Sequence, residues 1–296
     1  MPTGACTACS TTPASARRGR AILITGCSSG IGRAVARGLH ERGYRVLAGA
    51  RRQESVAELA GEGLEALRLD VDDPVSIGAA VDQVLERTGG RLYGLFNNAG
   101  FGQAGALEDL SRDALRAQFE TNLFGAHELI TRVLPAMRAR GEGRIIQNSS
   151  LLGLVALRYR GAYNASKFAL EGLTDTLRLE LAGTGIHVSL VEPGPVRSRF
   201  REHAFEAYRR HVRRDESPHR ETYLAMERRL TTPGPVAPFT LGPEAVLPAV
   251  VHALESRRPK ARYPVTVPTR FFAVARRLLP TRALDALLLA VSRRET

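Results

Sequence analysis

Lysine is almost absent from this chain of 296 residues, which carries 42 basic side chains, two of them lysine and forty arginine. Such a bias is typical of a GC-rich genome, in which arginine replaces lysine wherever it serves as well. An ammonium is a compact charge on a flexible stem, whereas a guanidinium is a flat fork with a higher pKa. A lysine that remains is a candidate for a role that arginine fills badly, and one of the two is Lys167.

Cysteines and long apolar runs are also scarce. The three cysteines form no disulfide framework, and Cys6-x-x-Cys9 lacks a second ligand pair, so we expect no metal site. Cys27 lies in a glycine-rich segment and is expected to serve there as a small side chain. No apolar run is long enough to span a bilayer, and the first twenty residues lack the apolar segment of a secretory signal. We therefore expect a cytoplasmic location.

The net charge of +12 is concentrated at the two ends of the chain. Residues 1–20 carry +3 and residues 255–296 carry +7, which leaves +2 for residues 21–254. A nucleic-acid-binding protein needs a basic face on a recognisable module, so we expect no nucleic-acid partner. The hydrophobic content of 44% and the charged content of 24% are those of a globular protein, long enough for one well-buried α/β domain.

Tyr163 precedes Lys167 by four positions, which places the two side chains on one face of a helix. A cation close to a phenol favours the ionised form. We therefore expect the phenol pKa, about 10 when free, to move toward the range of a general acid or base. The alternative is an ordinary helix with one buried aromatic and one solvated charge.

A glycine-rich turn follows the first apolar segment. Residues 21–25 predict a buried parallel strand, residues 26–32 read Gly-Cys-Ser-Ser-Gly-Ile-Gly, and residues 33–42 predict a helix. Glycines between a strand and a helix let backbone N–H groups approach a pyrophosphate. The pattern favours nucleotide binding over a purely structural turn.

The second strand, at residues 45–50, ends at Ala50 and is followed by Arg51 and Arg52. Domains that select NAD usually place a carboxylate here to hold the ribose 2′-hydroxyl. An arginine fork instead accepts a 2′-phosphate. The missing carboxylate favours NADP(H) over an interpretation of solvated loop charges.

Further apolar strands end in small or polar residues: Asp70 and Val71 after the third, Asn98-Ala99-Gly100 after the fourth, and Ser150 after the fifth. A sixth strand is predicted at residues 186–191. The alternation of strands and helices predicts an α/β fold, a single Rossmann-type doubly wound parallel sheet with helices on both faces. The carboxyl ends of its strands would face the ligand crevice.

Together these motifs resemble the short-chain dehydrogenase/reductase family over about residues 21–198. Segments around residues 25–29, 96–102 and 163–168 are similar to the hydroxysteroid and retinol dehydrogenase branch. Those at residues 241–246 and 262–266 are similar to bacterial NADP-dependent aldehyde reductases of that branch. The matching motifs are Thr25-Gly26-x-x-x-Gly30-Ile31-Gly32, Asn97-Asn98-Ala99-Gly100, Asn122-Leu123-Phe124-Gly125, Ser150, Tyr163-x-x-x-Lys167 and Pro193-Gly194-Pro195-Val196.

The resemblance implies a catalytic set of Asn122, Ser150, Tyr163 and Lys167. Bound NADPH is expected to deliver hydride to a carbonyl carbon while Tyr163 protonates the oxygen and Ser150 hydrogen-bonds to it. Lys167 is expected to lower the phenol pKa and hold the nicotinamide ribose, and Asn122 to hold a water. The expected cofactor-binding residues are Gly26, Ser28, Ser29, Gly30, Ile31, Gly32, Arg51, Asp70, Val71, Asn98, Ala99, Gly100, Tyr163, Lys167, Pro193, Gly194, Val196 and Ser198.

We divide the chain into a disordered leader over residues 1–20, a dehydrogenase domain over residues 21–268 and a basic extension over residues 269–296. In the family, the stretch at about residues 197–240 covers the substrate. The extension predicts two amphipathic helices separated by Pro280. The leucines after Ser150 suggest apolar walls, so we expect a hydrophobic aldehyde or ketone as substrate, steroid-like and retinal-like carbonyls included.

Two other classes of function stay open. A non-catalytic NADPH-binding sensor would need a damaged Ser/Tyr/Lys set, and here the set is intact. The arginine-rich extension, with its phenylalanines and leucines, would suit an interfacial membrane anchor. It equally suits a helix pair packed over the pocket or on a second subunit of a homo-oligomer, the interpretation that we favour.

Overall fold

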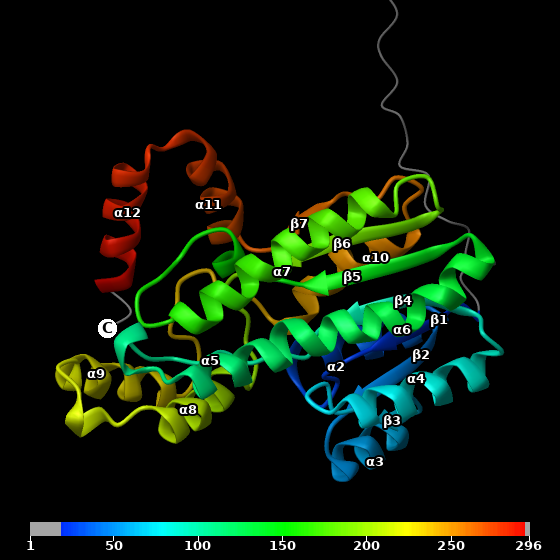
Figure 1. Cartoon of the computed structure of the whole chain (residues 1–296), viewed down its shortest axis with the longest axis horizontal. Helices are drawn as coiled ribbons and strands as arrows, with labels where there is room; N and C mark the ends of the chain where they lie inside the picture. Colours follow the sequence, from blue (N-terminus) through cyan, green and yellow to red (C-terminus); the bar gives the residue numbers. More distant parts are fainter. Residues whose placement is uncertain (1–18, 294–296) are drawn as a thin grey trace, which may run out of the picture.

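The sheet of this protein has seven strands, all parallel, in the order β3-β2-β1-β4-β5-β6-β7 (Figure 1). The computed structural model describes residues 19–293. The predicted doubly wound α/β fold is confirmed, because the chain builds one half of the sheet outward from β1 and then the other half from β4. The strands are β1 (Ala21–Ile24), β2 (Arg45–Ala50), β3 (Glu65–Arg68), β4 (Leu92–Asn97), β5 (Gly143–Asn148), β6 (Ile186–Glu192) and β7 (Arg262–Pro264).

Helices cover both faces of the sheet. Short 3-10 turns are η1 (Leu107–Asp109), η3 (Leu151–Gly153), η4 (Arg214–Glu216) and η5 (Pro243–Val246), and η2 (Glu120–Phe124) is a π-helix. The α-helices are α2 (Gly30–Glu41), α3 (Gln53–Gly61), α4 (Pro74–Thr88), α5 (Arg112–Phe119), α6 (Gly125–Arg140), α7 (Gly161–Glu180), α8 (Phe200–His211), α9 (Arg220–Thr231), α10 (Leu247–Glu255), α11 (Val267–Leu278) and α12 (Thr281–Arg293).

Alternating side chains of the strands feed two cores. Ile22 and Ile24 of β1 join the core that contains α2, α3 and α10, whereas Ala21 and Leu23 join the core that contains α4 and α6. This period of two follows from the pleat of a strand. Because β1 is apolar on both faces, it lies at the centre of the sheet, and the turn after it lies at the middle of the carboxyl edge.

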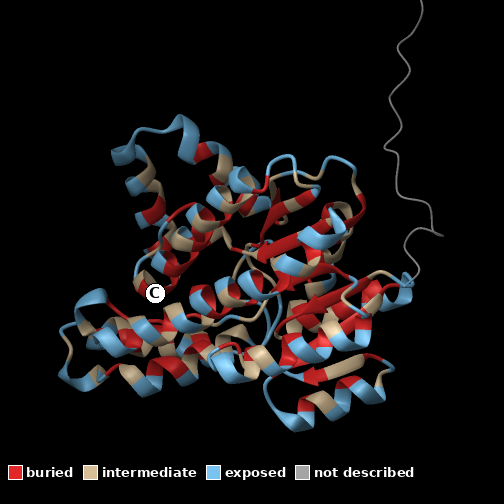
Figure 2. Ribbon diagram, turned by 45° about the vertical axis from the view of Figure 1, so that its right-hand side comes forward, coloured by how far each residue is buried: buried red, intermediate tan, exposed pale blue. Residues whose placement is uncertain are grey.

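Two smaller units lie outside these layers. Helices α8 and α9 lie in the stretch predicted to cover the substrate and are called the cover below. Tyr208, Tyr223 and Met226 of the cover share an apolar core with residues of the segment after β4, such as Ala106 and Leu110. Helices α11 and α12 form a hairpin that stands off the sheet (Figure 1), packed through Phe272 and Leu288. Figure 2 shows continuous burial within the sheet and broad exposure on this hairpin.

The structure corrects several boundaries. The helix expected from residue 33 begins at Gly30, because Ser29 is extended and the last residues of the glycine turn form the first helical turn. The third strand ends at Arg68, one residue before the end expected for it. Strand β7 was not predicted, since three residues carry no periodic signal. The two C-terminal helices were predicted, with a start two residues late for α11.

Part of the predicted leader, with Cys6 and Cys9, lies outside the described residues. Within residues 19–293, no helix combines the length and the hydropathy that crossing a bilayer requires. The same part of the chain contains no cluster of His, Cys, Asp and Glu side chains suited to a metal ion. Cys27 is buried in the glycine turn, where its thiol donates to the Ile24 carbonyl and burial raises its pKa.

Candidate active site

A cleft of about 760 Å³ runs along the carboxyl edge of the sheet, between the strand ends and the cover. Pockets that hold small ligands and cofactors have volumes of this order, about 300–1,000 Å³. All but two of the predicted site residues line it: Gly26, Ser28, Ser29, Gly30, Ile31, Arg51, Asp70, Val71, Asn98, Ala99, Gly100, Ser150, Tyr163, Lys167, Pro193, Gly194, Val196 and Ser198. The exceptions are Gly32 and Asn122, which lie behind the lining.

The glycine turn presents backbone rather than side chains to the cleft. Gly26 and Gly30 have φ of +69° and +57°, in the left-handed region that favours glycine. A Cβ on Gly26 would lie 2.9 Å from the Ala99 Cα, and one on Gly32 would lie 2.3 Å from the Gly26 carbonyl oxygen. Each glycine is therefore required for close approach, and Gly32 acts from behind the cleft wall.

Asn98 ties three strand ends together. Its side-chain amide donates to the Thr25 carbonyl at 2.9 Å, and its side-chain oxygen accepts from Asn148 at 2.9 Å. The Thr25 hydroxyl in turn accepts from the backbone N–H groups of Asn98 and Ala99, both at 2.9 Å. The glycine turn, the β4 end and the β5 end thus form one rigid floor. No sequence pattern indicated the roles of Thr25 and Asn148 in this floor.

Tyr163 and Ser150 meet as the sequence predicted. The phenol of Tyr163 is buried on α7 and hydrogen-bonds to the Ser150 side chain. The Ser150 oxygen also accepts from the Leu152 N–H at 3.1 Å, which caps η3 and fixes the hydroxyl at the β5 end. The Phe200 ring packs edge-on against Tyr163, with centroids 5.3 Å apart.

Lys167 lies one helical turn further along α7 and is also buried. Its ammonium donates to the Asn148 carbonyl at 2.7 Å and lies 5.8 Å from the centroid of the Tyr163 ring. Burial lowers the pKa of Lys167 to about 8, and the negative charge of Glu171 opposes that fall. The ammonium is therefore held by strand β5 as well as by its own helix.

The expected direction of the Tyr163 pKa is corrected by the structure. Burial raises the pKa of this phenol, although the Ser150 hydrogen bond and the charge of Arg160 act against the rise. Desolvation penalises the charged form of any acid, and here it outweighs the neighbouring charges. The sequence could not show how deeply the cover buries the ring.

Asn122 lies in η2, the π-helix that joins α5 to α6, and it is buried. Its side-chain oxygen accepts from the Phe101 N–H at 3.1 Å. Its amide donates to the Phe101 carbonyl and the Ser166 hydroxyl, both at 3.0 Å. Single π-turns inside α-helices occur frequently at functional sites. Here the turn aims Asn122 at the loop after β4 and at the neighbour of Lys167.

Arg51 and the loop after β3 line the far end of the cleft. Arg51 is exposed directly after β2, and its charge acts on Asp72 and on His203 of the cover. The last residue of β2 is the buried Ala50, so no carboxylate stands at the end of this strand. This end of the cleft can therefore accept a negative group.

The loop after β6 forms part of the wall of the cleft. The Pro193 carbonyl accepts from the Leu151 N–H at 2.8 Å, and a Cβ on Gly194 would lie 2.2 Å from the Thr266 hydroxyl. Val196 bridges to Leu241, and the Ser198 Cβ lies 2.9 Å from the position of a Cβ on Gly30. The cover thus begins in contact with the glycine turn.

Close to Lys167 lies a cluster of three carboxyl groups that was not predicted from the sequence. Arg262 of β7 contacts Glu171 at 3.0 Å, Asp175 at 2.6 Å and Glu192 at 3.3 Å. Burial, and secondarily the charge of Glu171, raise the pKa of Glu192 to about 8, against the pull of Arg262. The guanidinium of Arg262 therefore forms ion pairs with three carboxyl groups next to α7.

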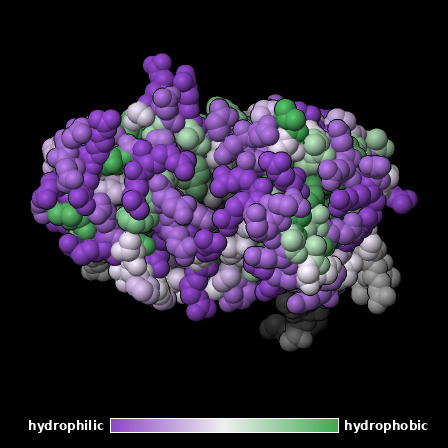
Figure 3. Space-filling view, turned by 90° about the horizontal axis from the view of Figure 1, so that it is seen from below, coloured by the Kyte–Doolittle hydropathy of each residue, from purple (hydrophilic) through white to green (hydrophobic). Residues whose placement is uncertain are grey.

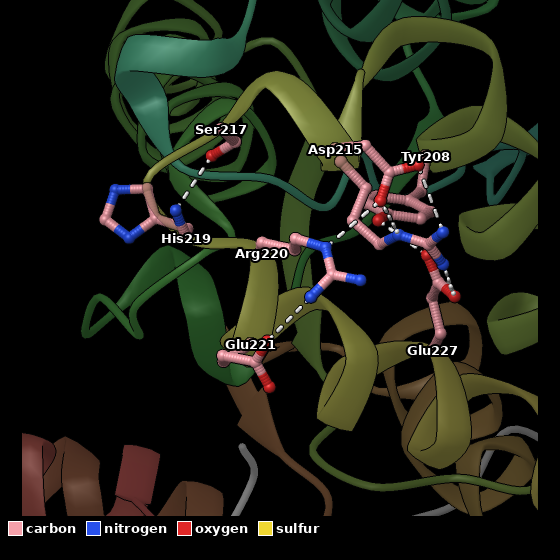
Figure 4. Close-up of polar contacts among 8 residues, drawn as sticks. Tyr208, Asp215, Ser217, His219, Arg220, Glu221 and Glu227 are labelled. Atoms are coloured by element: carbon pink, nitrogen blue, oxygen red, sulfur yellow. Dashed lines mark hydrogen bonds and ion pairs between the residues drawn. The ribbon is translucent and has the colours of Figure 1, made fainter.

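The cover is held together by its own polar network (Figure 4). The Tyr208 hydroxyl donates to Glu227 at 2.8 Å, and the guanidinium of Arg214 donates to Glu227 at 2.9 Å. Arg220 donates to Asp215 at 3.3 Å. These contacts tie α8, η4 and α9 into one unit.

A model of the short chain dehydrogenase family matches residues 20–209, which include the glycine turn, Ser150, Tyr163 and Lys167. The chain belongs to the short chain dehydrogenase family. The predicted resemblance is confirmed, and the chain is an oxidoreductase of this family.

Known members of the family match most of the chain. It is 46% identical over 269 residues to the Escherichia coli (strain K12) protein named uncharacterized oxidoreductase YbbO, covering 91% of this chain and 94% of that one. It is 36% identical to human retinol dehydrogenase 8, covering 82% and 80% of the two chains. It is 35% identical to rat 17-beta-hydroxysteroid dehydrogenase type 6, covering 93% and 89%.

Two solved structures of the family are similar in fold. One, from Burkholderia phymatum in complex with NAD, has a TM-score of 0.75 and 26% identity over 92% of this chain and 96% of that one. The other, from Burkholderia cenocepacia in complex with NADP, has a TM-score of 0.71 and 25% identity over 92% and 98%. The two neighbours thus differ in the nucleotide that each holds.

Proposed function

We propose that the chain is an NADP(H)-dependent carbonyl reductase that acts on hydrophobic aldehydes or ketones and, in reverse, on the corresponding alcohols. The observation that carries this proposal is the meeting of Ser150, Tyr163 and Lys167 in the same cleft as the glycine turn. A non-catalytic binding protein would have no need for a buried lysine and a buried phenol at that point.

The shape of the cleft fits a dinucleotide. The bare backbone of Gly26 and Gly30 at the start of α2 suits a pyrophosphate, and Asp70, Asn98 and the loop after β6 line the space beside it. When bound, the nicotinamide supplies the hydride for the carbonyl carbon. Arg51, with no carboxylate at Ala50, supports a preference for the 2′-phosphate of NADP(H).

Tyr163 acts as the general acid. Because burial raises its pKa, the phenol keeps its proton through the neutral range and can give it to the carbonyl oxygen as negative charge develops there. The Ser150 hydroxyl lies against the phenol and can donate a second hydrogen bond to the same oxygen. Donors arranged in advance around a developing charge are a principal source of rate enhancement.

Lys167 and Asn122 support that acid. The Lys167 ammonium stabilises the tyrosinate that remains after proton transfer, since an opposite charge favours the ionised form. Its bond to the Asn148 carbonyl and the Asn122–Ser166 bond fix α7 relative to the floor. The side-chain oxygen and amide of Asn122 already hydrogen-bond to Phe101 and Ser166. We therefore expect the predicted water to bind to backbone groups around η2 rather than to the Asn122 oxygen alone.

The substrate end of the cleft is largely apolar. Leu151, Leu152 and Leu157 line it beside Phe101 and Phe200. This lining supports a hydrophobic carbonyl compound as substrate. The names of the relatives at 35–36% identity support a second candidate, a hydroxysteroid or retinol dehydrogenase proper.

The test is the Tyr163→Phe variant. We expect NADPH binding, followed by nucleotide fluorescence, to stay within about twofold, while the rate of aldehyde reduction falls about 10²–10⁴-fold, the contribution of a positioned general acid. A panel of aliphatic aldehydes, retinoids and ketosteroids ranks the two candidates. Undiminished reduction of a good substrate by this variant would rule out the proposed mechanism.

A further inference from the structure

Helix α11 has two apolar faces, and only one of them is packed. Phe272 and Ala275 are buried against α12 and the loop after Ser150, together with Leu288. A surface helix normally has a single apolar stripe that faces the core. The second apolar face of α11 is therefore in excess of what the fold requires.

The second face is a straight stripe of large side chains. Val267, Phe271, Val274 and Leu278 are 56%, 54%, 57% and 75% exposed. Their spacing of four, three and four residues aligns them along one side of the helix. Figures 1 and 2 show that the hairpin stands off the sheet and that much of it is exposed.

Other exposed apolar side chains do not form such a line. Val75 on α4, Leu107 in η1 and Leu179 on α7 lie on different elements. The face seen from below, where the cover and α3 lie, is mostly hydrophilic, with apolar side chains in small separate groups (Figure 3). Single exposed apolar residues are normal, whereas a contiguous apolar patch marks an interaction site.

Positive charge lies beside the stripe. Arg270 and Arg277 are exposed next to it on α11, and Arg282 is exposed just after the hairpin turn. Residues 267–293 hold five arginines and one acid, a net charge of +4. A symmetric contact with a second copy would bring identical surfaces together and would oppose these arginines to one another. An anionic partner would neutralise them.

We propose that α11 binds the surface of an anionic phospholipid bilayer, with the stripe of Val267, Phe271, Val274 and Leu278 in the interface and Arg270 and Arg277 at the phosphates. Interfacial helices combine an apolar face with arginine or lysine in this way, and an anionic bilayer surface attracts such basic residues. Twelve residues of helix lie along the surface and do not span it.

Binding of α11 to a bilayer would also affect access to the cleft, and this consequence rests on the proposed function. The packed side of the hairpin contacts Leu151 and Leu157, and these two residues also line the cleft. A bilayer bound to the outer side would therefore lie one helix layer from the substrate end. Apolar carbonyl compounds dissolve in bilayers, so the enzyme would work beside its substrate reservoir.

The experiment is flotation of the full-length protein with vesicles, without turnover. One set of vesicles contains equal parts of phosphatidylcholine and phosphatidylglycerol, and the other contains phosphatidylcholine alone. We expect binding to the anionic set, which weakens as salt is raised. The Phe271→Ser/Leu278→Ser variant should bind at least about tenfold more weakly, since burying one such side chain is worth about 1.5–3 kcal/mol. The matched control Val75→Ser removes an equally exposed apolar side chain on α4 and should bind as the parent does.

Circular dichroism and NADPH oxidation in solution verify that the variants are folded. The proposal is overturned if the parent protein binds neither set, binds both equally at all salt concentrations, or if the stripe variant floats like the parent. A stripe variant that changes the oligomer mass, from a parent that does not float, would assign the stripe to a second copy. Since binding is measured without substrate, it can fail while the reductase function stands, and the reverse also holds.

Discussion

At the scale of single residues, the site is a stack of titratable groups along one face of α7. Tyr163, Lys167 and Glu171 follow one another at intervals of four residues. Burial shifts the pKa of each side chain in the direction that favours its neutral form. The charge of Glu171 acts against the fall in the Lys167 pKa. Glu171 touches no reacting atom in this arrangement, and we interpret it as a positioning residue.

Glu171→Gln removes that opposing charge. The pKa of Lys167, about 8 in the parent, should fall further, and the ammonium would be lost at lower pH. We therefore expect the alkaline limb of the kcat profile for reduction to move to lower pH. Asp175→Asn is the matched control, because Asp175 contacts Arg262 from the same helix but does not act on Lys167. An unmoved limb in Glu171→Gln would contradict this role.

Arg51→Ala tests the nucleotide preference. If the guanidinium binds the 2′-phosphate, its loss removes a charge-assisted contact worth about 1.5–3 kcal/mol. The KM for NADPH should rise about tenfold or more, whereas the KM for NADH should stay within about twofold. Arg52→Ala, one position further in the same loop, serves as the comparison. Equal changes for both nucleotides would show that Arg51 does not distinguish them.

The sequence predicted that Ser150, Tyr163 and Lys167 lie in one cleft, but it did not predict the direction of the Tyr163 pKa. Ser150 and Asn98 were predictable because the carboxyl ends of parallel strands share one edge, and Tyr163 and Lys167 because helical spacing fixes them. The direction of the Tyr163 pKa depends on burial beneath Phe200, a residue of the cover. The pairing of Glu192 with Arg262 joins residues that are 70 positions apart, and no local pattern signals it.

At the scale of elements, glycines decide which helices can approach the sheet. Gly125 begins α6, and a Cβ there would lie 2.0 Å from the Val71 carbonyl oxygen. The π-helix η2 just before it turns Asn122 inward. No sequence pattern indicates this wider turn, because five residues of π-helix have the same composition as an α-helix. The short strand β7 was not predicted either, because three residues are too few to show a periodic pattern.

Gly172→Ala and Gly125→Ala form a matched pair. A Cβ on Gly172, in the middle of α7, would have no atom within 4 Å. Alanine there should stabilise the helix by about 0.5–1 kcal/mol, which corresponds to a rise in Tm of about 1–4 °C. Gly125→Ala should lower Tm, since the clash is with backbone. Thermal unfolding followed by circular dichroism measures both, and a lower Tm for Gly172→Ala would refute the argument.

At the scale of the molecule, the cover shares an apolar core with the segment after β4 and is also joined to that segment by polar contacts around Asp109. Ser217 donates to Asp109 of η1 at 2.7 Å, and the Tyr223 hydroxyl donates to the same carboxylate. The Tyr223 oxygen also accepts from the Ala106 N–H at 2.9 Å. His219 of the cover also contacts Glu108 of η1. Asp109 accepts two of the hydrogen bonds between the cover and the segment after β4, so it is a central polar contact between them.

Asp109→Ala should loosen the cover without touching the nucleotide end of the cleft. We expect the KM for the carbonyl substrate to rise several-fold, the KM for NADPH to stay unchanged, and limited proteolysis between α8 and α9 to become faster. Asp113→Ala is the control, because the Asp113 side chain is 81% exposed and forms its ion pair with Arg116 of its own helix. Identical proteolysis of the two variants would argue against a fastening role.

The position of α12 also governs how the protein should be handled. Ser292, near its end, lines a small cavity together with Tyr163 and Phe200. A fluorescent label attached at position 292 would therefore lie beside the Tyr163 and Phe200 rings.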